Sequence, residues 1–178
     1  MITTYLIISH LVSDFLLQPA GLIKWKMSSF KGTVFHVFVF EFISLIILFP
    51  YLYKWETWVI VGLIGIVHFF TDQAKINIEL KKDPSDVPFI ADQGIHYLSL
   101  ILGGHFLDTL NIHVCYKWFD TCLEKNLIMW IILMAIIYLI YCVKIALIHK
   151  TKQKIFQKII VFTLVYLIYF GTVIVVFK

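Results

Sequence analysis

The sequence predicts an all-α integral membrane protein, a single polytopic bundle of about six transmembrane helices over residues 1–178. Three observations predict this class. The chain is 61% hydrophobic and only 15% charged, whereas about a quarter of the residues in soluble domains are charged. Its mean hydropathy is +0.90. Its apolar residues also gather in long runs, and a run of about 20 residues is enough to cross a bilayer.

Six apolar segments are the expected helices, because open strands would leave backbone groups unsatisfied in lipid. They cover about 3–18, 33–53, 57–75, 88–108, 126–148 and 157–177. The first segment lacks a basic leader and contains His10 and Asp14, so we interpret it as retained structure rather than a signal peptide. It is also short and polar enough to form a re-entrant hairpin instead. Residues 19–32 mix lysines with apolar residues and are expected to lie at the membrane interface.

Lysines alternate between the connections of these segments. The first, third and fifth connections carry eleven lysines, and the second and fourth carry three. Because basic residues concentrate in cytoplasmic loops, we expect the odd-numbered connections in the cytoplasm and both termini outside, in a multi-pass protein of the inner (plasma) membrane. The net charge of +4 would suggest nucleic acid for a soluble chain. Here the lysines act as topology signals, so no nucleic-acid partner is expected.

A His and an Asp lie four positions apart in three of the expected helices. The pairs are His10 with Asp14, His68 with Asp72, and Asp92 with His96. This spacing places both side chains on one face of an α-helix. The fourth helix should run opposite to the first and third, so its reversed order brings the three histidines to one depth. With a rise of about 1.5 Å per residue, the aspartates lie roughly 5 Å and the histidines roughly 10 to 12 Å inside the cytoplasmic boundary, with His36 beside the aspartates.

This residue set predicts a site for a divalent metal, with zinc favoured, because imidazole and carboxylate groups are its ligands. Ionisable groups inside a membrane generally mark functional sites. The candidate ligands are His10, Asp14, His36, His68, Asp72, Asp92 and His96. Seven groups exceed the four typical of one zinc, so either two ions bind or some of the residues have other roles.

The remaining roles at this site are assigned by residue type. Asp14, Asp72 and Asp92 are the candidate catalytic groups, since a carboxylate that is not a ligand can orient or deprotonate water. Gln18, Gln73, Lys75 and Gln93 are candidates for orienting the ligands or the substrate. The site-bearing helices lie within residues 1–108, and the helices of 126–177, which carry no carboxylate, are expected to be scaffold.

Three functions fit the same residues. The first is a metal-dependent hydrolase acting on a lipid or amphipathic substrate that reaches the site from the membrane on the cytoplasmic side. The second is an ion- or proton-coupled transporter or channel, which needs a polar path to the outer face through Glu41, His105 and Asp108. The third is a metal-binding component without catalysis.

The order and spacing of these motifs resemble those of a known bacterial family. The pattern runs from His10-x-x-x-Asp14-x-x-x-Gln18 through His36 and His68-x-x-x-Asp72-x-x-Lys75 to Asp92-Gln93-x-x-His96. It resembles the membrane proteins of domain-of-unknown-function family 3307 over about the first 100 residues. A looser similarity extends to inner-membrane metal-dependent hydrolases, which implies that reaction class by analogy.

Overall fold

Residues 2–80, 86–110, 127–148 and 152–176 are described by a computed structural model, and every element within these ranges is helical. The all-α prediction is therefore confirmed for this part of the chain. The elements in order are α1 (Ile2–Leu11), the π-helix η1 (Val12–Leu16), α2 (Ala20–Ser28), α3 (Phe30–Ile47), the 3-10 turn η2 (Phe49–Tyr51), α4 (Trp55–Glu79), α5 (Val87–Thr109), α7 (Leu127–Ile148) and α8 (Lys152–Val176).

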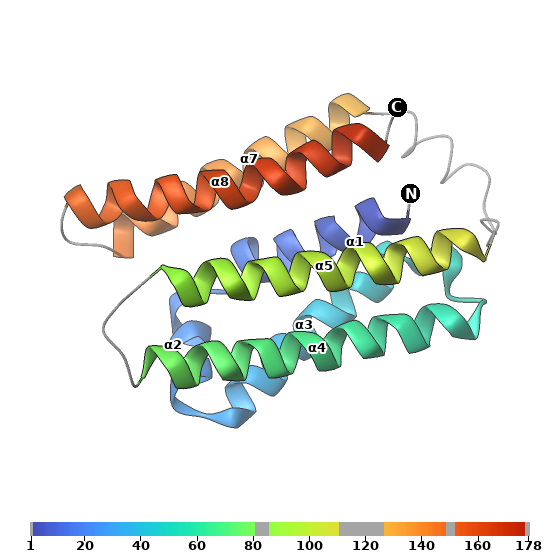
Figure 1. Ribbon diagram of the computed structural model, residues 1–178, viewed down its shortest axis with the longest axis horizontal. Coiled ribbons are helices and arrows are strands. Elements are labelled where there is room, and N and C mark those ends of the chain that lie inside the picture. The colour runs from blue at the N-terminus through green and yellow to red at the C-terminus, as the bar shows by residue number, and fades with distance from the viewer. Residues whose placement is uncertain (1, 81–85, 111–126, 149–151, 177–178) are drawn as a thin grey trace.

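The long helices α4, α5, α7 and α8 lie along the longest axis of the molecule (Figure 1). In the same view α1 and α4 run in one direction and α5 runs back, as the sequence predicted. The first helix is the most enclosed, since all residues of α1 are buried. It packs against α3, α5 and α8. The polar residues of α1 are thereby surrounded by helices from both halves of the chain.

The chain turns sharply after η1. The helix α2 is bent by 92° from the preceding segment Ile2–Leu16 and stands across one end of the bundle (Figure 1). Pro19 precedes α2 with extended backbone angles, φ −69° and ψ 159°. Proline cannot donate the amide hydrogen bond that would continue η1. Residues predicted to lie at the interface therefore form a separate short helix that crosses the direction of the others.

The second expected segment, 33–53, is divided in the structure. The α-helix ends at Ile47 and a 3-10 turn follows over Phe49–Tyr51. Pro50 explains the break, because its missing N–H and its ring disrupt a continuing α-helix. At the other end of α3, Ser29 caps the helix by accepting a hydrogen bond from the Lys31 N–H at 3.2 Å, which is a common role for serine.

Among the residues that the structure describes, three helical stretches are long and apolar enough to cross a membrane: Phe30–Ile47, Trp55–Glu79 and Ile155–Thr172. Counting the bent pair Ile2–Leu16 and Ala20–Ser28 as one span gives up to four. This is fewer than the six expected. The helix α5 is 23 residues long, but Asp92, Gln93 and His96 lower its hydropathy. Large apolar side chains nevertheless remain exposed on α3, α4 and α5, as expected of surfaces that face lipid, so the chain has the character of a membrane protein.

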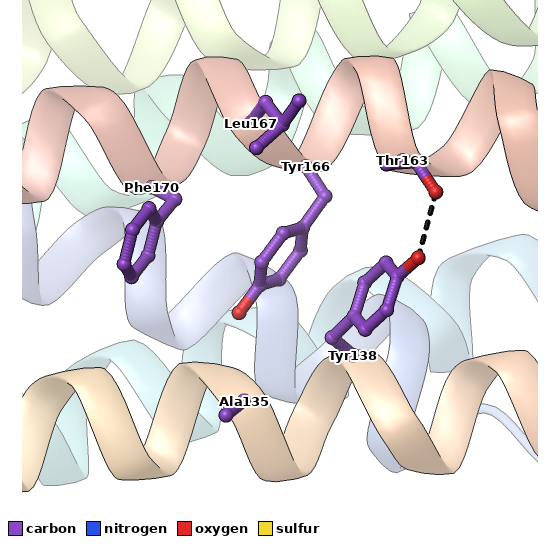
Figure 2. A pocket seen from close by; sticks show the side chains of 6 residues that line it. All are labelled: Ala135, Tyr138, Thr163, Tyr166, Leu167 and Phe170. Carbon is purple, nitrogen blue, oxygen red and sulfur yellow. Dashed lines mark hydrogen bonds between the residues drawn. The ribbon is translucent and has the colours of Figure 1, made fainter.

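The helices α7 and α8 pair through aromatic side chains. Tyr138 and Thr163 share a hydrogen bond of 2.7 Å between their hydroxyl groups (Figure 2). Beside it lies a cavity of about 370 Å³ lined by Ala135, Tyr138, Thr163, Tyr166, Leu167 and Phe170. Figure 2 shows that these side chains come from α7 and α8 alone. The cavity includes none of the candidate site residues.

Candidate metal centre

The first His/Asp pair lies where α1 changes from an α-helix to a π-helix. The wider turn is closed by the Leu17 N–H, which donates to the Val12 carbonyl at 2.8 Å. Ser13 fixes the carboxylate here, because its hydroxyl lies 2.9 Å from both an Asp14 oxygen and the His10 carbonyl oxygen. His10 Nδ1 is 3.3 Å from Asp14 Oδ1. Single π-helical turns occur frequently at functional sites, and the sequence spacing alone did not indicate this one.

The four candidate histidines form one buried group. The ring centroids of His68 and His96 are 4.1 Å apart, and the His10 centroid is 5.4 Å from that of His68 and 5.0 Å from that of His96. His36 Nε2 lies 3.1 Å from His68 Nε2. None of the four side chains is exposed by more than a few per cent. Four helices therefore bring their histidines together, which the reversed order in the fourth segment predicted for three of them.

The three aspartates surround the same group. Asp14 Oδ1 is 3.5 Å from His36 Nε2 and 3.7 Å from His68 Nε2. Asp72 Oδ2 is 3.6 Å from each of these two nitrogen atoms. Asp92 Oδ1 lies 3.2 Å from His96 Nε2. His36 is thus placed between two carboxylates.

Two lysines compensate two of the buried carboxylates. Lys75 Nζ, a candidate for orienting the ligands or the substrate, is 3.0 Å from Asp92 Oδ2. Lys26 Nζ is 2.7 Å from Asp72 Oδ2. Sequence reasoning missed Lys26, which was counted only as a topology signal. One feature of the sequence could have indicated it: three carboxylates were expected inside the membrane, and Lys75 was the only cation assigned to them.

Three glutamines were predicted to orient the ligands or the substrate. Gln18 and Gln93 contact the cluster, and Gln73 does not. With its amide oriented to satisfy both ends, Gln18 donates to the Asp14 backbone oxygen at 3.3 Å and accepts from Lys26 Nζ at 3.1 Å. The same amide lies 3.4 Å from His36 Nδ1. Gln93 Nε2 donates to Asp92 Oδ2 at 3.1 Å. Gln73 instead donates to Thr33 Oγ1 at 2.5 Å, so it joins α4 to α3 rather than contacting the cluster.

Aromatic side chains close the group on its apolar side. The rings of Phe40 and His68 stack with centroids 5.0 Å apart. Tyr169 of α8 lies 5.8 Å from the His10 ring, and its hydroxyl donates to the Gln93 carbonyl at 3.3 Å. The scaffold assigned to the last two helices therefore includes one residue in direct contact with the candidate site. No sequence pattern distinguished Tyr169 from the other aromatic residues of α8.

The polar residues considered for a path to the outer face lie elsewhere. Glu41 lines a groove of about 270 Å³ between α3 and α4, where Gly65 leaves room for its carboxylate. Asp108 is near the opposite end of α5 and accepts from the Ile2 N–H at 3.1 Å. His105 is exposed. These three residues do not join the cluster.

The donor atoms fit a divalent metal. Three overlapping groups place one ligand atom from each member within 4.8 Å of the others: His10, Asp14 and His68; His36, His68 and Asp72; Asp72, Asp92 and His96. Within the described structure, His10 Nε2, His96 Nδ1 and Asp72 Oδ1 are buried without a hydrogen-bond partner, whereas His10 Nδ1 and His96 Nε2 each lie within 3.3 Å of an aspartate oxygen. Buried polar atoms normally have partners, so a bound cation would account for these.

The fold and this cluster define a class: a helical, lipid-compatible protein with a buried centre of histidines and carboxylates. The family model described as "Protein of unknown function (DUF3307)" matches residues 2–120. This is more than half of the chain, so the protein belongs to that family, and the resemblance seen in the motifs is confirmed. The matched range contains all seven candidate ligands. No curated protein and no solved structure matches the chain.

Proposed function

We propose that this protein is a membrane-embedded, metal-dependent hydrolase acting on a lipid or other amphipathic substrate. The observation that carries the proposal is the buried cluster of four histidines and three aspartates with unpartnered donor atoms. Burying this many ionisable groups in an apolar bundle is costly unless they are paired or coordinate metal. Zinc is the favoured ion, because nitrogen and oxygen ligands of this kind suit it.

The geometry favours one or two ions in a shared site rather than three independent metal sites. His68 and Asp72 each belong to two of the three ligand groups, so neighbouring ions would share them. A divalent ion, when bound, lowers the pKa of a coordinated water and polarises an ester. The protein's own contribution is to hold that water away from bulk solvent and to supply a base. Asp14, Asp72 and Asp92 are the candidate bases, each already beside an imidazole.

Hydrolysis would add water across the ester bond of the substrate. The water oxygen bonds to the acyl carbon or the phosphorus atom, a carboxylate accepts the proton released, and the ester C–O or P–O bond breaks. The same carboxylate then returns the proton to the departing alcohol. A buried site suits this series of reaction steps, because excluding bulk solvent strengthens the electrostatic interactions among the reacting groups.

Transport by the same residues has less support. It requires polar groups between the cluster and the opposite end of the bundle. The described residues in between include fully buried Leu6, Leu100 and Leu107, and the candidate path residues lie in a lateral groove or at the far end. A hydrolase needs access to the cluster from one side only and requires no polar path through these buried leucines.

We further propose six membrane crossings, with α1 and η1 as the first and α3, α4, α5, α7 and α8 as the others. The lysine distribution would place the α2 end of the bundle, and with it the site, at the cytoplasmic face of the inner membrane. The near-perpendicular α2 suits a helix lying in the interface beside the site.

The first test is elemental analysis of detergent-purified protein, wild type against His10→Ala, His68→Ala and His96→Ala. We expect about one or two divalent ions per chain in the wild type, lost in all three variants. His105→Ala is the matched control, because this histidine is exposed on the same helix as His96, and it should retain the metal.

Activity is measured on the same samples with p-nitrophenyl butyrate and bis(p-nitrophenyl) phosphate. We expect hydrolysis that is removed by a chelator, restored by zinc, and reduced at least about a hundredfold in the His68→Ala and Asp92→Asn variants. A well-folded wild type without metal would contradict the proposal. So would variants that keep both metal and activity.

A further inference from the structure

Of the two lysines of the cluster, Lys75 is the more accessible. Its side chain is 19% exposed, whereas that of Lys26, at 9%, is as buried as that of Asp14, at 8%. The carboxylates with which the two lysines pair, Asp72 and Asp92, are each only 1% exposed. Lys75 is therefore the more exposed member of its pair with Asp92.

The charges of the site change sign when metal binds. Three carboxylates and two ammonium groups, with neutral histidines, have a formal charge of −1. One divalent ion changes this to +1, and a second changes it to +3. The ions would also engage the carboxylates with which the lysines now pair. A buried positive charge requires a compensating anion, so a metal-loaded site favours an anionic substrate over a neutral one.

A phosphate group satisfies this requirement best. Lysine binds phosphate as a compact point charge, and the two lysines come from different helices, α2 and α4, and pair with carboxylates of one ligand group, Asp72 and Asp92. Divalent metal sites also stabilise the charge that develops on a phosphoryl group during its hydrolysis. A neutral carboxylic ester would bring no negative charge to compensate the metal and the two ammonium groups.

The helix that carries Lys26 also points to a lipid. Trp25 and Met27, its neighbours in α2, are 43% and 39% exposed, and Phe30 just beyond is 63% exposed. The helix thus presents large apolar side chains outward and one ammonium group inward. A molecule that combines acyl chains with a phosphate group would contact both surfaces of this helix.

We propose that the metal-loaded cluster binds the phosphate group of a phospholipid through Lys26 and Lys75. This inference rests on the proposed function, because the bound metal supplies the positive charge that the phosphate group would compensate.

The test is calorimetric titration of zinc-loaded protein in maltoside detergent with three probes: dihexanoyl phosphatidic acid, inorganic phosphate and dihexanoylglycerol. We expect phosphatidic acid to bind most tightly, phosphate more weakly and the uncharged glyceride not at all. Lys75→Gln should weaken phosphatidic acid at least tenfold, and Lys75→Arg should stay within about threefold of the wild type. Lys24→Gln, which removes an exposed charge from the same helix as Lys26, should leave binding unchanged.

The metal content and the helical circular dichroism of every sample are also measured. They distinguish failure of the phosphate-binding inference from failure of the proposed hydrolase function. If the wild type and Lys75→Gln both hold zinc and bind phosphatidic acid equally, the lysine assignment is wrong while the hydrolase proposal stands. If phosphate binds as tightly as phosphatidic acid, or the glyceride binds best, the phospholipid assignment is wrong. If the folded wild type holds no zinc, both the proposed function and this inference fail.

Discussion

Lys26 occupies an environment that differs from its sequence context. It lies in a short segment of mixed lysines and apolar residues, yet its side chain is buried and forms an ion pair of 2.7 Å with Asp72. Gln18 can accept a second hydrogen bond from the same ammonium group. A buried ion pair adds little net stability, but removing one partner leaves an uncompensated charge. Lys26 is therefore tied to the charge of Asp72 and not only to membrane topology.

This pairing predicts a large effect in the metal-free protein. Lys26→Met should lower the free energy of unfolding by about 3 kcal/mol, because Asp72 would remain buried without its cation. Lys24→Met, two residues earlier and exposed, should change it by less than about 0.5 kcal/mol. Chemical unfolding in detergent with a chelator present, followed by circular dichroism, measures both. Equal stability of the two variants would show that the pair does not hold the folded state.

The position of α2 depends on its close approach to the start of α3. A Cβ atom added at Gly32 would lie 2.5 Å from the Trp25 carbonyl carbon and 2.6 Å from the Lys26 nitrogen. Both are backbone atoms, so the clash cannot be relieved by a rotamer change. Because Lys26 belongs to the approached segment, the spacing of these two helices also sets the distance between the lysine and Asp72.

Gly32→Ala should accordingly displace α2. We expect a loss of about 1 to 3 kcal/mol in unfolding free energy and a weaker affinity for phosphatidic acid, since Lys26 moves with the helix. Gly21→Ala is the matched control, because a Cβ atom there meets nothing within 4 Å and alanine favours helix. Thermal unfolding of both variants in detergent is the measurement. Equal behaviour of the two would contradict the role assigned to this contact.

At the scale of the whole molecule, α1 and α4 run in one direction and α5 runs in the other (Figure 1). The C-terminal parts of α1 and α4 and the N-terminal part of α5 therefore contribute to the same cluster. The topology that we propose from the lysine distribution would place this end in the cytoplasm. Lys31, at the start of α3, and Lys54, between α3 and α4, are both exposed. They should lie on opposite sides of the membrane.

This orientation predicts the labelling of cysteines in intact bacterial cells. In a background with Cys115, Cys122 and Cys142 replaced, Lys54→Cys should react with a membrane-impermeant maleimide before permeabilisation. Lys31→Cys should react only afterwards, because it would face the cytoplasm. The reverse pattern would invert the proposed orientation. Labelling of both positions in intact cells would contradict a crossing by α3.

The sequence by itself determined the helical class, the apolar character and the three His/Asp pairs, since a helix converts a spacing of four residues into one shared face. It also placed His36 near the aspartates. Only the tertiary structure decided the π-helical turn at Asp14, the right angle at α2, and the approach of Lys26 and Tyr169 to the cluster. Periodicity within one helix is local information. Which side chains from distant segments meet depends on how the helices pack, and no local pattern of an apolar chain encodes that packing.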